Sequence, residues 1–266
     1  MQLKVLCVGD VVGAPGRRVL SEAIPAIVRR HQIDCVIVNA ENAAGGSGLT
    51  PAIFEKILHY GVHVVTLGDH IYRRREIISV LERSDRIVRP ANLPVGAPGK
   101  DHTIYVTDRD QRVAVISLLG RIFMKRPFDC PFAVVDRVLA ALPRDIRIII
   151  VDMHAEATSE KVAMGWHLDG RVSAVFGTHT HVPTADEHVL PKGTAYVTDV
   201  GMTGPYDSVL GRDKQRVLAA LVRGLPDTLD VASGDVRLCG AIVSIESTTG
   251  LATGIERIVF NGTVEA

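Results

Sequence analysis

The first seventy residues alternate apolar, strand-like runs with segments of helical spacing, and this alternation is the feature that most constrains the fold. Thr50 is suited to cap the second helix ahead of Pro51, and Gly61 is suited to end it. Successive strand–helix units of this kind predict a layered α/β fold with parallel strands. The strand-like runs are residues 3–10, 34–42 and 62–70, and the helical segments are residues 17–31 and 51–61.

The second half of the chain is rich in strands. Residues 102–109 and 112–120 predict a hairpin, and helices are predicted near 132–142 and 213–223. This pattern indicates two sheets packed face to face with helices outside. We find no internal repeat, linker or low-complexity segment, so we interpret 94–100 as a loop and expect a single domain over residues 1–266. Further strands are predicted in residues 146–154, 172–183, 193–205, 236–247 and 254–262.

Composition limits the class of protein. Of the 266 residues 47% are hydrophobic, which is enough for a large core, and 30 basic residues balance 30 acidic ones. This balance argues against a general nucleic-acid binder but not against a small phosphate ligand. Asp10 interrupts the apolar N-terminus, and no stretch approaches the ~18 apolar residues of a membrane span. We therefore expect a soluble cytoplasmic protein. Its cysteines form no CxxC pair and are expected to be free thiols in a reducing compartment: Cys7, Cys35, Cys130 and Cys239.

Each of five strand-like runs ends on side chains that can bind a metal. In open α/β sheets, ligands bind beyond the carboxyl ends of the strands, so these side chains are expected to converge on one rim. They are Asp10 after the first run, Glu41 and Asn42 after the second, Asp69 and His70 after the third, His154 after the run that begins at residue 146, and His179 and His181 after the run that begins at residue 172.

Each of these residues also has a simpler interpretation. Asp10 could cap a helix, Glu41 could be an ordinary loop acid, and His154 could be a satisfied buried polar residue. His179 and His181 are a stronger signal, because alternate residues of an extended segment point to the same side and both rings could then face a metal. Taken together, the five strand ends predict a metal site.

The donors outnumber one coordination shell, so two metal ions are expected. Mixed carboxylate, amide and imidazole ligands suit a pair of Mn, Fe or Zn ions, and such pairs serve in-line displacement at phosphorus. The glycines of residues 9–18 do not form GxGxxG or a P-loop, and GxSxG is absent from the chain. The run Arg73, Arg74 and Arg75 is either a solvated helix face or a device that steers an anionic substrate.

Several motifs resemble those of the bacterial YmdB-like family of calcineurin-like metallophosphoesterases. The similarity runs in order over nearly the whole chain and weakens after about residue 225. The motifs are GDVVGAPGRR, NAENAAGGSG, GDHIYRRREI, RPAN, HAEATSEK, GTHTHVPTAD and TDVGMTGPYDSVLG.

The resemblance implies a four-layer α/β/β/α metallophosphoesterase sandwich with two divalent or trivalent metals, Fe or Mn. It implies that Asp10 binds the first metal with help from Asn42, and that Glu41 bridges the two. Asp69 and His154 would bind the second metal. The remaining assignments divide His179 and His181 between the metals and make His70 the proton donor.

One position departs from the pattern of the superfamily, which usually has Gly-Asn-His where this chain has Gly-Asp-His at residues 68–70. A carboxylate oxygen also coordinates metals, so the ligand role of Asp69 is retained while the neutral amide is lost. His70 would then be free of the metal and placed to serve the leaving group.

The resemblance further implies a phosphodiesterase that acts on cyclic nucleotides. The expected substrates are 2′,3′-cyclic nucleotides, with 3′,5′-cyclic nucleotides as further candidates. A metal-bridging hydroxide would attack phosphorus in line, and His70 would protonate the departing ribose oxygen. The alternative is a slow-turnover nucleotide-binding regulatory protein, and a third interpretation is a di-metal amide or nucleotide hydrolase of another type. We expect a small-molecule phosphodiester substrate, no membrane, no stable nucleic-acid binding and a homo-oligomer.

Overall fold

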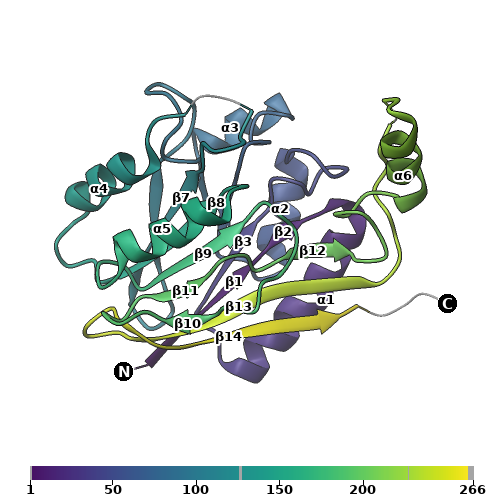
Figure 1. Ribbon diagram of the computed structural model, residues 1–266. Coiled ribbons are helices and arrows are strands. Elements are labelled where there is room, and N and C mark those ends of the chain that lie inside the picture. Colours follow the sequence, from purple (N-terminus) through teal and green to yellow (C-terminus); the bar gives the residue numbers. More distant parts are fainter. Residues whose placement is uncertain (1, 126–127, 227, 263–266) are drawn as a thin grey trace.

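Two β-sheets lie at the centre of the protein in the computed structural model, which describes residues 2–125, 128–226 and 228–262 (Figure 1). The eight-stranded sheet has the order β2-β12-β13-β1-β3-β4-β5, with β14 paired to β13. The six-stranded sheet has the order β10-β11-β9-β8-β7-β6. Residues 1 and 263–266 of the predicted single domain lie outside the described residues.

The strands of the two sheets have the following bounds. The eight-stranded sheet contains β1 (Gln2–Val8), β2 (Asp10–Val11), β3 (Cys35–Asn39), β4 (Val64–Thr66), β5 (Ile87–Val88), β12 (Met202–Pro205), β13 (Val236–Glu246) and β14 (Ala252–Asn261). The six-stranded sheet contains β6 (His102–Val106), β7 (Arg112–Leu119), β8 (Ile148–His154), β9 (Ala174–Thr178), β10 (His188–Val189) and β11 (Ala195–Val197).

Parallel pairing dominates the part of each sheet that positions the candidate site. Strands β1, β3, β4 and β5 are parallel neighbours, as the alternation in the first seventy residues predicts. Strands β7, β8, β9 and β11 are parallel in the other sheet, and β6 pairs antiparallel with β7, which confirms the predicted hairpin. The carboxyl ends of the parallel strands in each sheet therefore lie along one edge.

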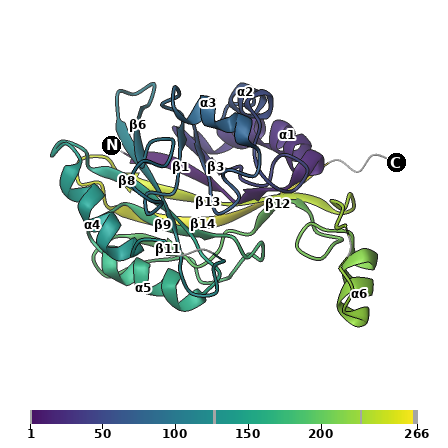
Figure 2. The same cartoon turned by 90° about the horizontal axis from the view of Figure 1, so that it is seen from above.

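A shared hydrophobic core joins the two sheets. Ile37 of β3 belongs to one buried cluster with Val115 of β7 and Phe176 of β9. Helices α1 (Gly13–His31) and α2 (Pro51–His59) pack on the eight-stranded sheet, and α4 (Pro131–Ala141) and α5 (Thr158–Leu168) pack on the six-stranded sheet. Figure 2 shows these helix pairs on opposite sides of the sheets. The protein is a mixed α/β fold with two sheets and flanking helices.

The helix boundaries are close to the predicted ones at α2, α4 and α6, whereas α5 was not predicted and two further interpretations differ from the structure. The Thr50 hydroxyl accepts a hydrogen bond from the Ile53 amide at 3.3 Å and caps α2, as predicted. Helix α1 begins at Gly13 rather than Arg17, because the chain enters the helix almost directly after β2. The interpretation of Arg73–Arg75 as a helix face is wrong for the first two residues, which precede a short 3-10 helix (Arg75–Ile77) and α3 (Ile78–Leu81).

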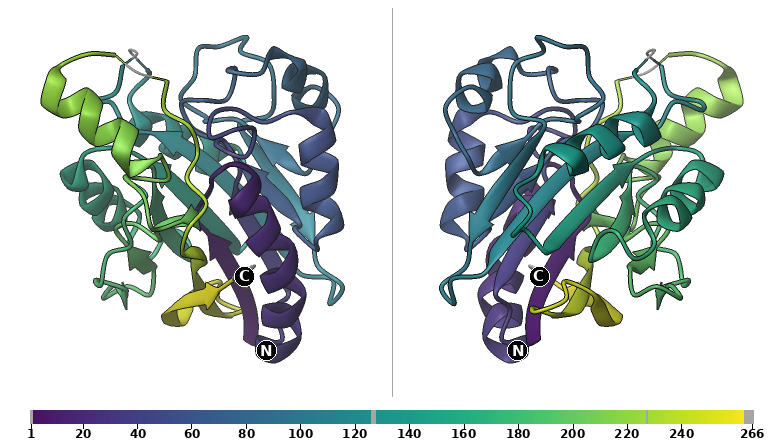
Figure 3. Two further views of the ribbon diagram at one scale, coloured as in Figure 1. Left: turned by 90° about the vertical axis from the view of Figure 1, so that its right-hand side faces the viewer. Right: turned by 90° about the vertical axis from the view of Figure 1, so that its left-hand side faces the viewer.

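Helix α6 (Lys214–Arg223) projects from the body of the protein (Figure 3). It carries Leu221 and Val222, whose side chains are largely exposed.

The homo-oligomer expected from the sequence stays a prediction. Within the described part of the chain, no helix combines the length and the apolar character that crossing a membrane requires. The four cysteines are free, as predicted.

Candidate metal centre

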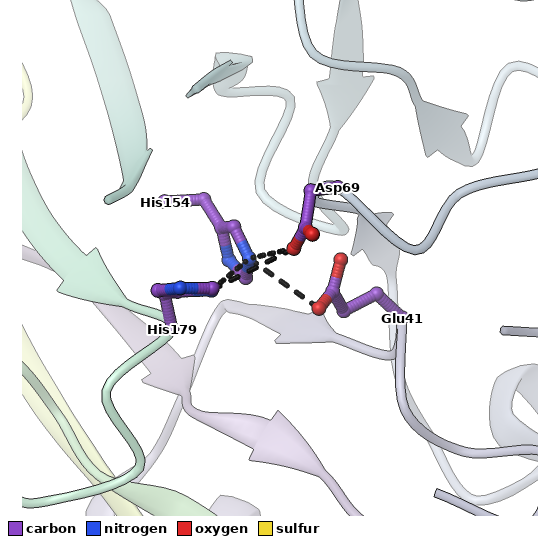
Figure 4. Close-up of side chains that lie close together, drawn as sticks. All are labelled: Glu41, Asp69, His154 and His179. Carbon is purple, nitrogen blue, oxygen red and sulfur yellow. Dashed lines mark hydrogen bonds and ion pairs between the residues drawn. The ribbon is translucent and has the colours of Figure 1, made fainter. Parts of the chain in front are cut away.

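Four side chains from the carboxyl ends of four strands converge on one point (Figure 4). Glu41 follows β3, Asp69 follows β4, His154 ends β8 and His179 follows β9. One ligand atom from each lies within 4.8 Å of all the others. The Nε2 atom of His154 is central, at 3.3 Å from a Glu41 oxygen, 3.4 Å from an Asp69 oxygen and 3.0 Å from His179 Nδ1. Carboxylates and imidazoles at this spacing form a set of donors that could hold a transition metal.

Gly68 makes room for this convergence. A Cβ atom at position 68 would collide with the His154 ring and with the Glu41 carboxylate. The glycine of the Gly-Asp-His run is therefore required by the close approach of the two ligands.

A second group of donors adjoins the first. Asp10 Oδ1 lies 3.9 Å from His181 Nε2, and Asn42 Nδ2 lies 3.3 Å from the same nitrogen. Asn42 Nδ2 also donates to Glu41 Oε1 at 3.2 Å, so Glu41 touches both groups. The structure thus brings together all seven predicted ligand residues, while the ion that each one holds stays a prediction.

The surroundings of the Asp10 carboxylate indicate a cation site at this second group of donors. Asp10 is fully buried, and its Oδ1 atom has no hydrogen-bond partner among the residues that the structure describes. An unsatisfied buried oxygen costs about 1–3 kcal/mol, and more when it is charged. Asp10 does not cap α1, since Val12 occupies the N-cap position. A bound cation would satisfy this oxygen, so the donor set fits a metal.

A buried network fixes the ring of His154. The Thr178 hydroxyl donates its proton to Asp152 at 2.6 Å, and it lies 2.9 Å from His154 Nδ1. Since a hydroxyl has one proton, it can only accept from His154, and Nδ1 must carry the hydrogen. Thr66 and Asn39 also donate to Asp152, at 2.5 and 3.0 Å. In the neutral ring, the Nε2 lone pair of His154 therefore faces the cluster, as a metal ligand requires.

The two histidines that follow β9 reach the site in a different way from the one predicted. They do not lie in an extended segment, because β9 ends at Thr178 and the φ angles of His179 and His181 are +95° and +65°. The prediction of alternating extended residues is wrong on this point. Hydrogen bonds hold the turn instead: the His179 amide donates to Asp10 at 3.0 Å, and the Thr180 hydroxyl donates to Asp199 at 2.7 Å. Both rings still face the cluster.

Several residues near the site were not predicted from the sequence. Glu156 lies 3.3 Å from His179 Nε2, on the side of the ring away from the cluster. Asp152 and Asn39 interrupt apolar strands, and this pattern was the available signal for a buried polar network. Lys161 and Asp199 occur in two of the quoted motifs but give no sign in the sequence that they pair.

His70 borders the cluster and remains partly open to solvent, with 27% of its side chain exposed. Its Nδ1 atom lies 2.7 Å from the Asn42 amide oxygen, and its Nε2 atom lies 3.9 Å from Asp69 Oδ2. Burial alone would lower the pKa of His70, but the hydrogen bond to Glu41 and the charges of Glu41 and Asp69 raise it above its usual value. The neighbouring carboxylates thus stabilise the protonated form of His70.

Burial and close charges shift the pKa values of the other groups. Burial raises the pKa of Asp10. Burial would also raise the pKa of Glu41, but the charge and hydrogen bond of His154 hold it well below its usual range. Burial would lower the pKa of His154, yet Glu41 and Asp69 raise it well above its usual value. Burial and the neighbouring His154 lower the pKa of His179 to about 4, which leaves this ring neutral and able to coordinate.

Known proteins resemble this chain over nearly its full length. The family model for the YmdB-like protein matches residues 6–258. A 2′,3′-cyclic-nucleotide 2′-phosphodiesterase of Bacillus subtilis strain 168 is 45% identical over 259 residues, which cover 97% of each chain. A putative phosphatase/phosphodiesterase of Mycoplasma pneumoniae is 34% identical and covers 93% of this chain and 89% of its own.

Two solved structures share the fold. A hypothetical protein from Thermus thermophilus superposes with a TM-score of 0.91 at 41% identity, covering 98% of this chain and 100% of its own. A novel phosphatase of Mycoplasma pneumoniae superposes with a TM-score of 0.92 at 32% identity, covering 98% and 94%.

A hydrolase whose candidate metal centre lies at the carboxyl ends of parallel strands is the class of protein that the fold, the site and these relatives define. The chain belongs to the YmdB-like protein family.

Proposed function

We propose that this protein is a metal-dependent phosphodiesterase that hydrolyses 2′,3′-cyclic nucleotides, with 3′,5′-cyclic nucleotides as further candidate substrates. The observation that carries the proposal is the cluster of Glu41, Asp69, His154 and His179, of which Glu41 and His154 are buried and the other two partly buried. The B. subtilis relative, which is named a 2′,3′-cyclic-nucleotide 2′-phosphodiesterase, supports the choice of substrate.

Two transition-metal ions, Fe or Mn, would occupy the centre. Asp10, Asn42 and His181 would hold one ion, and Asp69 and His154 would hold the other together with His179. Glu41 touches both groups of donors and would bridge them. We also propose that the two sheets and their helices form the α/β/β/α sandwich of the metallophosphoesterases.

The metal ions, when bound, activate water and stabilise the negative charge that develops on the phosphoryl oxygens during in-line displacement. A side chain of the protein would protonate the leaving group. Asn42 Oδ1 engages Nδ1 of His70, so Nε2 is the nitrogen left to give a proton to the departing ribose oxygen. The raised pKa of His70 suits it to be a general acid.

The test combines metal analysis with a panel of cyclic nucleotides on one preparation. We expect about two transition metals per chain and hydrolysis of 2′,3′-cyclic substrates. A reproducibly metal-free sample with full activity would contradict the metal centre. Tight binding of nucleotides without turnover, in a metal-loaded sample, would favour the regulatory alternative.

A further inference from the structure

Two cavities open beside the candidate metal centre and share a wall. Asp69, Tyr72 and Phe128 line both of them. One has a volume of about 270 Å³ and is also lined by Arg73 and Lys125. The other has a volume of about 510 Å³. Since Asp69 is a member of the metal-competent cluster, both cavities adjoin the cluster.

The larger cavity is apolar. Its floor contains the buried side chains of Ile71, Leu93 and Leu119, and the Pro-rich loop 93–98 forms a further wall. The Tyr72 hydroxyl donates a hydrogen bond to Pro98 O at 2.9 Å, which holds the aromatic ring against this loop. The volume is within the range of about 300–1,000 Å³ found for small-molecule sites, which are mostly apolar and aromatic.

The smaller cavity is cationic. Arg73 and Lys125 reach it, and neither forms an ion pair with a carboxylate in the described part of the chain. Two positive charges next to a centre for phosphate chemistry attract an anionic group. The two cavities together thus match a ligand that has a flat apolar part and a phosphate.

We propose that the apolar cavity formed by Tyr72, Phe128 and the loop 93–98 is the binding site for the nucleobase of the substrate. This inference rests on the proposed function. The base stacks on aromatic and aliphatic side chains, and the ribose phosphate extends past Asp69 toward the metal cluster. Few polar side chains line the cavity, so the contact area between the base and the cavity wall determines which bases bind tightly. The larger purines therefore bind more tightly than pyrimidines.

A matched set of substrates tests the proposal. Adenosine 2′,3′-cyclic phosphate, cytidine 2′,3′-cyclic phosphate and 1-O-methylribose 2′,3′-cyclic phosphate have the same reacting group, and a methoxy group replaces the base in the third. We expect KM to increase in that order for the wild-type protein, by roughly tenfold or more from the first to the third. A base-free substrate with the KM of the adenosine compound would overturn the proposal.

Filling the cavity should remove this selectivity. Ala97 is half-buried and lines the cavity, so Ala97→Phe is expected to raise KM for adenosine 2′,3′-cyclic phosphate to near the base-free value. The fall in kcat/KM should be much smaller for the base-free substrate than for the adenosine compound, because the added ring occupies the space of the base. Ala52→Phe, at an exposed position of α2, is the matched control and should change neither value. Equal losses on both substrates in Ala97→Phe would contradict a base site.

A second variant tests the base site if Ala97→Phe does not fold, and a binding measurement tests it if no cyclic phosphate is hydrolysed. Phe128→Leu keeps an apolar wall but removes the aromatic face. It should raise KM more for substrates with a base than for the base-free substrate, whether or not Ala97→Phe folds. If metal-loaded wild-type protein hydrolyses none of the cyclic phosphates, the proposed function fails. The base site is then judged by equilibrium dialysis with adenosine 3′-monophosphate: binding that Ala97→Phe weakens supports it, and absent or unchanged binding overturns it.

Discussion

The Nζ atom of Lys161 lies 2.6 Å from Oδ2 of Asp199, and both side chains are buried. Asp199 also accepts hydrogen bonds from the amide and the hydroxyl of Thr180, the residue between the two histidines of the candidate centre. The ion pair therefore holds the turn that directs His179 and His181 toward the cluster.

We expect Asp199→Asn to destabilise the protein and to reduce its metal content. The substitution leaves the Lys161 charge buried without its partner, which typically costs about 3–5 kcal/mol. Denaturant unfolding and elemental analysis measure the two effects. Asp145→Asn breaks the exposed Arg112–Asp145 pair and serves as the control, with an expected change of at most about 1 kcal/mol. Equal effects of the two substitutions would contradict the positioning role.

Thr178 should control metal affinity through the tautomer of His154. Thr178→Val removes the hydroxyl oxygen that accepts from His154 Nδ1. The same oxygen also accepts from Asn39 Nδ2, so both buried donors lose a hydrogen-bond partner. We expect metal affinity to fall roughly 10–100-fold, as is usual when the partner that orients a ligand is lost. Thr178→Ser retains the hydroxyl and should stay near the wild type. Metal titration of the two variants shows whether the hydroxyl or the methyl group of Thr178 determines metal affinity.

His70→Ala should keep the metal and lose turnover. A general acid contributes roughly 10²–10⁴-fold, and most when the leaving oxygen is basic. A cyclic nucleotide should therefore be affected more than an activated aryl phosphodiester such as bis-p-nitrophenyl phosphate. The acid role would be refuted by equal losses on the two substrates, or by loss of metal from the variant.

Asp69 should strengthen metal binding by its charge. Its Oδ1 atom lies 3.4 Å from His154 Nε2 and 3.6 Å from His179 Nδ1, so a carboxylate there adds a negative charge among the donors. Asp69→Asn is expected to stay folded and active with weaker metal binding, and Asp69→Ala to lose one ion or most activity. If Asp69 is only a solvated loop acid, competition titrations will give the wild-type affinity for both variants.

Metal binding should stabilise the protein more at higher pH. Burial raises the pKa of Asp10, so in metal-free protein its ionised form costs folding free energy. That cost is absent below the ordinary pKa of the carboxyl and increases as the pH rises toward the raised value. A metal ion needs the ionised form and offsets the cost. The thermal shift on adding Mn²⁺ should thus be larger at about pH 7.5 than at about pH 5, and Asp10→Asn should reduce this difference.

The sequence was sufficient for the parallel strands and for the rim of donors. Apolar runs such as Cys35–Asn39 mark buried strands, and Glu41, Asp69 and His154 follow from the position at which each run ends. The histidine turn was not predictable, because the positive φ angles depend on hydrogen bonds from distant residues. The same reason applies to the contact of Asn39 with Asp152, which are separated by 113 residues in the chain.

The candidate centre takes its donors from both sheets. Asp10, Glu41 and Asp69 belong to the side of the eight-stranded sheet, and His154 and His179 to the side of the six-stranded sheet. The thickness of the hydrophobic layer between the sheets, where Phe176 lies, therefore sets the distance between the two halves of the ligand set. A substitution that swells or shrinks this layer alters coordination geometry from a distance. Side chains between the sheets thus influence the chemistry of the protein, although none of them needs to touch the substrate.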